Sequence, residues 1–201
     1  MKDEIPLCPK GHPLDERNAY YRPDRINPKP RCRICARERT SAWRARKTQR
    51  NREMARRDAE SRYPKPAEVE CAWAAGLFEG EGTITISSSG RILHTRPVVT
   101  LTMTDQEPVG WLAERWGGSV RIRSMPGNAK DAHVWHLGSA IGIGRFLDHI
   151  EPFVKTARVR AKIALMREYV SHQRSGSRDP DYRAQMRVFK ERMSALNQRG
   201  R

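Results

Sequence analysis

The alternation of apolar and polar residues between positions 67 and 172 predicts a mixed α and β domain. Apolar residues at every second position mark four strands, Thr83–Ser88, Arg96–Thr104, Ser119–Ser124 and Ala132–Leu137. Helical spacing marks the segments around them, at about 67–81, 105–117, 141–150 and 155–172. The order αββαββα, with one extra helix, predicts an α+β fold whose four-stranded antiparallel sheet carries helices on one face.

Three segments outside residues 67–172 lack this pattern. Residues 1–36 contain few apolar residues and many prolines, which predicts a small separate module. Residues 37–66 predict a basic helical linker that ends at a Pro-Lys-Pro break. Residues 173–201 are a basic C-terminal tail with a possible helix at 182–196. The sequence does not decide whether that helix docks on the domain, docks on a partner, or stays loosely ordered.

The charge balance points to nucleic acid as the partner. The formal net charge is +16, and arginine outnumbers lysine by 30 to 9. Because guanidinium groups bind phosphates and guanine edges, nucleic acid is the first partner to consider. Arg44, Arg46 and Lys47 of the linker are expected to lie along a DNA groove or against phosphates. The alternatives are a solvated linker and an arginine excess that reflects a high-GC genome.

The chain carries no obvious membrane or secretion signal. No stretch approaches 18 apolar residues, and the N-terminus begins Met-Lys-Asp-Glu without an apolar core. Three of the four cysteines form a pattern better suited to metal than to disulfides, which predicts a reducing location. We therefore expect the protein inside the cell, in the cytoplasm.

Two residue pairs in the first 36 positions have the spacing of metal ligands. Cys8 and His12 form a Cys-x3-His pair, and Cys32 and Cys35 form a Cys-x2-Cys pair. Together they supply the four ligands of a tetrahedral zinc site, which would provide folding energy that so small a core cannot. The pairs resemble the zinc knuckles attached to many phage-type endonucleases. A coincidence of buried cysteines is the alternative.

The run from Trp73 to Gly82 combines small residues with two acids and passes directly into the first strand. A helix with many small residues on one side can approach another helix backbone to backbone. An acid at the C-terminal end of a helix opposes the helix dipole, so we expect a cation there. Residues 74–82 resemble the nine-residue LAGLIDADG motif of homing endonucleases, with Glu81 on its last acid. The order of predicted elements is also that of this family.

The resemblance implies a homodimer, because single-motif members of the family pair through the motif helix. The two helices would pack at Ala74, Ala75, Gly76 and Gly80. Glu81 and the backbone carbonyl of Gly80 would bind Mg²⁺, which would let the two Glu81 carboxylates lie close together. The implied reaction is magnesium-dependent cleavage of both DNA strands, leaving short 3′ overhangs. The family often has Asp at the position of Glu81, and a simple helix-end acid is the alternative.

The resemblance further implies a catalytic lysine and a DNA-reading sheet face. Lys155 is the candidate by position, and an ordinary lysine near a helix start is the alternative. Val120 and Ile122 are expected to face the helices, like Ile84 and Ile86. The opposite face would read the major groove through alternating side chains, namely Thr83, Thr85, Ser87, Arg96, Thr100, Thr102, Arg121, Arg123 and His136. A solvated sheet face also favours threonine and arginine.

These features favour a site-specific homing-type DNA endonuclease whose zinc module extends the contact with DNA. The alternative is a LAGLIDADG-derived protein that does not cleave, such as an RNA maturase or a DNA-binding regulator. A third hypothesis places nuclease chemistry in the Cys/His segment, as in ββα-metal nucleases. That chemistry needs a free histidine beside the knuckles, whereas His12 is expected to be a ligand.

Overall fold

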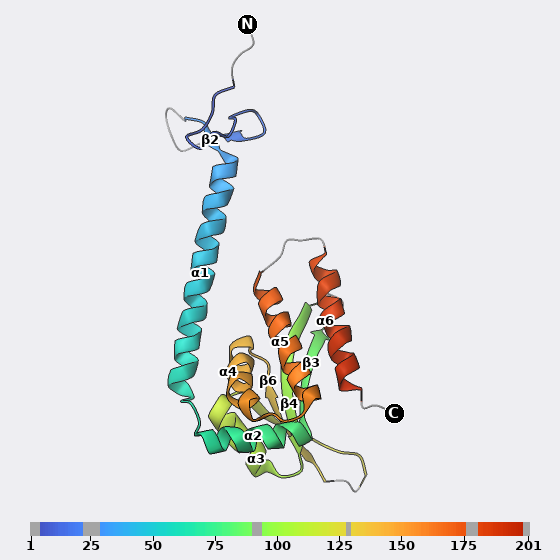
Figure 1. Cartoon of the computed structure of the whole chain (residues 1–201). Helices are drawn as coiled ribbons and strands as arrows, with labels where there is room; N and C mark the ends of the chain where they lie inside the picture. Colours follow the sequence, from blue (N-terminus) through green and yellow to red (C-terminus); the bar gives the residue numbers. More distant parts are fainter. Residues whose placement is uncertain (1–4, 22–28, 90–93, 128–129, 176–180, 199–201) are drawn as a thin grey trace. The chain divides into compact units, whose positions relative to one another are not determined.

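The computed structural model describes residues 5–21, 29–89, 94–127, 130–175 and 181–198. The chain divides into two compact units, Met1–Arg56 and Arg57–Arg201, and helix α1 (Arg33–Arg62) passes from the first into the second (Figure 1). The residues Ser-Ser-Gly-Arg at 88–91 and Pro-Gly-Asn at 126–128 predict turns, and both segments fall partly outside the described residues.

The first unit has little regular structure before helix α1. Strand β1 (Ala19–Tyr20) pairs antiparallel with β2 (Arg31–Cys32), and Leu7 forms an isolated antiparallel bridge with Pro13. Helix α1 follows β2 directly and contains no buried residue. The buried residues of the unit's described part, Cys8, Asn18 and Cys32, all lie in or beside the Cys/His cluster described below.

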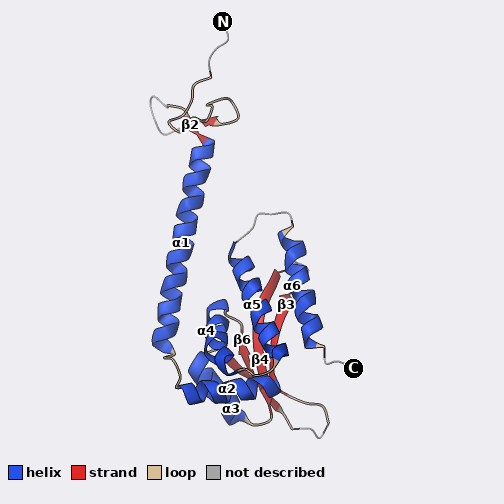
Figure 2. Ribbon diagram, viewed as in Figure 1, coloured by secondary structure: helices blue, strands red, loops and turns tan. Residues whose placement is uncertain are grey.

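The second unit is built on an antiparallel sheet in the order β3-β4-β6-β5 (Figure 2). Its strands are β3 (Gly82–Ser89), β4 (His94–Met103), β5 (Ser119–Arg123) and β6 (Ala132–Leu137). Its other elements are α2 (Glu68–Glu81), α3 (Gln106–Trp116), α4 (Ala140–Ile150), the 3₁₀ turn η1 (Glu151–Phe153), α5 (Ala157–Ser175) and α6 (Tyr182–Asn197). The predicted α+β fold and element order are confirmed.

Aromatic rings join the helices to one face of the sheet. Phe146 of α4 lies at the centre, with its ring centroid 5.2 Å from Phe78, 5.3 Å from Trp116 and 5.0 Å from Trp135. All four side chains are almost fully buried, and all three pairs have the edge-to-face geometry that aromatic rings favour. One residue therefore ties α2, α3, α4 and strand β6 into a single core.

Helix α6 settles the question that the sequence left open about the tail. It packs along strand β3 and helix α5 (Figure 1), with Met186 and Met193 buried in the core. The Asn197 side chain donates a hydrogen bond of 2.9 Å to the backbone carbonyl of Ile84. Because β3 is an edge strand, α6 covers an edge that could otherwise pair with another chain.

The opposite edge strand departs from the prediction. Ile84 and Ile86 are buried as expected, whereas Val120 is 37% exposed and Ile122 is 67% exposed. Val120 lies opposite Trp135 and so shares its face, but β5 is a short edge strand at the margin of the core. The two β5 side chains therefore lie on the expected face of the sheet, but the core does not extend far enough to cover them.

Candidate functional site

Helix α2 is fixed at its first turn by Glu70. This carboxylate accepts hydrogen bonds from the backbone N–H of Ala67, at 2.8 Å, and from the Arg115 side chain, at 2.9 Å. Both interactions lower the pKa of Glu70, the backbone hydrogen bond most. The helix buries Cys71 and Phe78 against the sheet and the other helices, so its C-terminal end has a defined position.

The C-terminal end of α2 presents oxygen atoms to solvent. Glu81 is the last helical residue and is exposed, and within the described part of the chain it has no hydrogen bond or ion pair. The N–H of Gly82 bonds the carbonyl of Phe78, so the later carbonyls, including that of Gly80, lack a helical donor. The Glu81 carboxylate and the Gly80 carbonyl are thus hard oxygen donors at one helix end, the type that Mg²⁺ prefers.

Gly82 allows the chain to leave the helix and enter β3 without a linker. A Cβ atom there would lie 2.1 Å from Cδ2 of Phe78 and 2.5 Å from the Phe78 carbonyl oxygen. The Phe78 ring cannot move away easily, because it packs against Phe146. Any larger residue would therefore displace the core immediately beside Glu81.

Lys155 is held next to this helix end through its backbone. Oε1 of Glu79 accepts hydrogen bonds from the backbone N–H groups of Lys155, at 2.9 Å, and Thr156, at 2.6 Å. Partial burial acts to raise the pKa of Glu79, but the hydrogen bonds from Thr156 and Lys155 outweigh it and lower the pKa. Glu79 thereby caps the start of α5, a role that the sequence analysis did not identify.

The structure changes the expected contact face of α2. Ala74 and Ala75 are fully buried in the chain's own core, so their predicted place between two copies is corrected. Gly76 and Gly80 are exposed, and an added Cβ at either would meet nothing within 4 Å. At about 100° per residue they share one stripe with two exposed apolar side chains, Val69 and Trp73. We call these four residues the α2 stripe.

The nine predicted DNA-contacting side chains of the sheet fall on one face. Directly paired residues share a face, and the pairs Thr83–Thr100, Ser87–Arg96 and Thr100–His136 connect β3, β4 and β6. The remaining members are Thr85, Thr102, Arg121 and Arg123, and all nine are partly or fully exposed. The sequence pattern also places Val98 of β4 on this face, pointing outward, but Val98 is only 5% exposed, so an outward contact by this side chain is ruled out.

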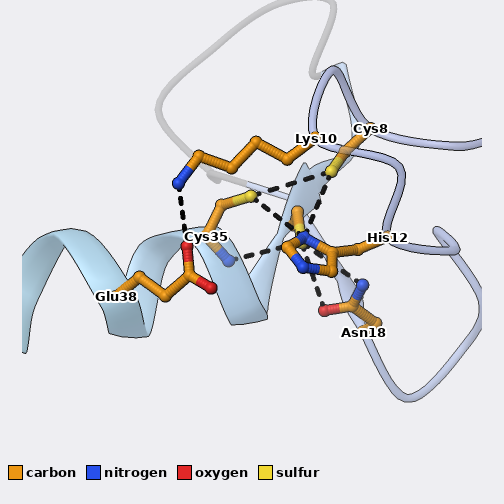
Figure 3. A network of polar contacts seen from close by, with 7 residues as sticks. Cys8, Lys10, His12, Asn18, Cys35 and Glu38 are labelled. Atoms are coloured by element: carbon orange, nitrogen blue, oxygen red, sulfur yellow. Dashed lines mark hydrogen bonds and ion pairs between the residues drawn. The ribbon is translucent and has the colours of Figure 1, made fainter.

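The four predicted zinc ligands converge in the first unit. The ligand atoms of Cys8, His12, Cys32 and Cys35 all lie within 4.8 Å of one another. Nδ1 of His12 is 3.5, 3.7 and 3.3 Å from the three sulfur atoms, in sequence order, and the Cys8 and Cys35 sulfurs are 3.7 Å apart (Figure 3). A tetrahedron with Zn–S bonds of about 2.3 Å has edges of about 3.8 Å, so the cluster fits zinc.

Hydrogen bonds support this cluster from outside. The Cys32 sulfur accepts from the backbone N–H of Cys35, at 3.4 Å, and from the Asn18 amide, at 3.3 Å. Burial acts to raise the pKa of Cys32, but these hydrogen bonds outweigh it and lower the pKa to about 6. Such donors stabilise a thiolate, the form that binds metal. The sequence analysis missed Asn18, which no spacing rule marks.

The basic linker residues are fully accessible. Arg44, Arg46 and Lys47 all lie on helix α1 and are exposed, and the Lys47 ammonium is 5.0 Å from the centre of the Trp43 ring. No helix among the described residues is long and apolar enough to cross a membrane.

No protein-family model and no curated protein sequence matches this chain. Similar solved structures include the homing endonuclease I-CvuI in complex with an I-CreI target. That complex was formed in the presence of magnesium, and its DNA is not cleaved. It has a TM-score of 0.53 and 16% identity, covering 67% of this chain and 86% of that one. The archaeal intron-encoded homing endonuclease I-Vdi141I, complexed with DNA, has a TM-score of 0.53 and 14% identity over 67% and 87%. The chain thus has the LAGLIDADG homing endonuclease fold.

Proposed function

We propose that this protein is a site-specific, homing-type endonuclease that makes magnesium-dependent double-strand breaks in DNA with short 3′ overhangs. The observation that carries the proposal is the free carboxylate of Glu81 at the exposed end of α2. The similarity of the protein's fold to I-CvuI and I-Vdi141I, both solved in complex with DNA, supports the same proposal. Such a reaction takes place where the cell keeps its DNA, in the bacterial or phage-infected cytoplasm.

Glu81 and the Gly80 carbonyl would hold the magnesium ion. Bound there, the ion supplies Lewis-acid activation of a scissile phosphate and lowers the pKa of a water molecule. Glu81 neutralises part of the ion's charge and fixes its position at the helix end. Lys155, anchored by Glu79, would place its ammonium near the phosphate and stabilise developing negative charge.

The α2 stripe would form the contact between two copies. Gly76 and Gly80 lie one turn apart without side chains, which lets two helices approach closely. Val69 and Trp73 extend the stripe with apolar surface that is exposed in the single chain. A homodimer built on this stripe brings two Glu81 carboxylates to one place, as cutting both strands requires.

The sheet face and the first unit would supply DNA recognition. Hydroxyls and arginines on the nine-residue face suit the edges of bases in the major groove. A structural zinc ion held by Cys8, His12, Cys32 and Cys35 would order the first unit, whose helix α1 adds phosphate contacts.

Cleavage of the DNA around the gene's own insertion site tests the proposal. Wild type and Glu81→Gln are compared with magnesium and with calcium, and Glu114→Gln, an exposed glutamate of α3, is the matched control. We expect double-strand cutting by wild type and Glu114→Gln in magnesium only, and binding without cutting by Glu81→Gln. Binding without cutting by all three proteins would instead support the non-cleaving regulator, and preferential binding of the intron RNA would support the maturase.

A further inference from the structure

The cations of helix α1 are not distributed evenly around it. At about 100° per residue, all but two of the cations between Ile34 and Arg56 fall within one half of the circumference. These are Arg37, Arg39, Arg44, Arg46, Lys47 and Arg50, which we call the basic face. Over residues 34–56 that half contains no acid, and all six side chains are exposed. The first acid on that half is Asp58, beyond this segment. Within the described part of the chain, none of the six forms an ion pair.

The opposite half of the same segment is neutral. It carries Arg52 and Arg56 together with Glu38 and Glu53, so its charges cancel. Both acids interact within the protein, because Glu38 pairs with Lys10 at 2.9 Å (Figure 3) and Glu53 accepts a hydrogen bond of 3.1 Å from Gln49. A helix that served only as a solvated linker has no reason to separate its charges in this way.

The basic face is divided into two rows. Arg39, Arg46 and Arg50 form one row, and Arg37 and Arg44 form another about 150° away around the helix. Lys47 lies between the rows, and its ammonium is 5.0 Å from the centre of the Trp43 ring, a side chain that is 54% exposed. An α-helix is about 10–12 Å across and the major groove of B-DNA is about 12 Å wide, so rows on the two flanks match two phosphate strands.

We propose that the basic face of α1 lies in the major groove of duplex DNA, with its two rows on the phosphates of the two strands. Trp43 then faces the groove, and Arg52 faces solvent. This inference rests on the proposed function, since it takes DNA as the partner. Duplex RNA fits less well, because its major groove is too deep and narrow for side chains to read.

Salt-dependent binding of the full-length protein to a mixed-sequence DNA duplex tests this orientation. The assay contains no divalent metal ion, so it is independent of cleavage. Each phosphate contact contributes about 0.9 to the slope of log K against log salt. We expect Arg46→Gln to lower that slope by about 0.9. The matched variant Arg52→Gln, with the same charge change on the same helix, leaves the slope unchanged.

A second measurement uses Trp43 as a reporter. We expect DNA to change the tryptophan emission of wild type and Arg52→Gln, and we expect Trp43→Phe to lose that change while still binding. Equal slope changes in Arg46→Gln and Arg52→Gln would overturn the proposal in favour of diffuse charge. The proposal would also be overturned by an unchanged slope in the triple variant Arg39→Gln, Arg46→Gln and Arg50→Gln. Tighter binding to an RNA duplex than to a DNA duplex would overturn it as well.

Discussion

The carboxylate oxygen Oε1 of Glu79 accepts a hydrogen bond of 2.9 Å from the backbone N–H of Lys155, a residue 76 positions further along the chain. The same oxygen accepts the N–H of Thr156, so one side chain joins the last turn of α2 to the start of α5. Glu79 therefore organises the surroundings of Glu81 through hydrogen bonds to its own Oε1 atom. The two acids of the motif have separate tasks, one structural and one proposed to be catalytic.

We expect Glu79→Gln to destabilise the protein by about 1–2 kcal/mol, since hydrogen bonds to a charged acceptor are worth more than neutral ones. Glu114→Gln is the control, because it removes an exposed acid that forms no hydrogen bond or ion pair with the described residues. Urea unfolding at neutral pH measures the difference, and equal stability of the two variants would contradict the capping role.

The Glu79 contribution has a defined pH dependence. Because folding lowers the pKa of Glu79, its stabilisation is fully present above the unfolded carboxyl pKa of about 4.3. It is lost as the pH falls through the lower pKa of the folded state. Unfolding midpoints measured from pH 7 downward should therefore show wild type and Glu79→Gln converging in acid, and a constant gap would refute this assignment.

Replacing the two exposed glycines of the α2 stripe should separate dimer formation from stability. Gly76→Ala with Gly80→Ala raises the stability of the single chain by up to about 1 kcal/mol per site, because alanine favours helix over glycine. The added methyl groups should weaken dimerisation. Sedimentation velocity measures association, and Gly110→Ala, in a helix position with equally open space, is the control.

Zinc content should depend on three of the four cysteines. We expect one zinc ion per chain by atomic emission and none after Cys35→Ala, while thermal unfolding of the second unit is unchanged. Cys71→Ala is the control, because Cys71 is buried in the core of the second unit. Absence of zinc from the wild type would show that the cluster is not a zinc site, and full retention by Cys35→Ala would show that Cys35 is not needed to hold the ion.

Docking of α6 should stabilise the second unit. Met193 is 1% exposed, so Met193→Ala should cost about 2–5 kcal/mol, as for other buried methionines. Met125, which is 42% exposed, provides the control, with little change expected for Met125→Ala. Calorimetric unfolding of both variants makes the comparison, and equal stabilities would mean that α6 does not belong to the folded core.

The sequence by itself determined the fold class and the two metal-binding patterns. Alternation at Ile84 and Ile86, the helical spacing around them and the glycine-rich motif are local signals, because secondary structure follows from neighbouring residues. The same holds for the Cys-x3-His and Cys-x2-Cys pairs, in which spacing alone brings two ligands together. The exposure of Val120 and Ile122 could not be predicted, since alternation shows the face but not how far the core extends.

Only the tertiary structure decided which side of α2 is free, what Glu79 binds, and where the tail lies. Small residues at Ala74 and Gly76 look alike in a sequence, but only packing shows that one is buried and the other exposed. The hydrogen bond that Glu79 accepts from the backbone of Lys155 joins residues 76 positions apart, and the one that Asn197 donates to Ile84 joins residues 113 positions apart. Contacts of that kind depend on how the whole chain folds, and no local pattern encodes them.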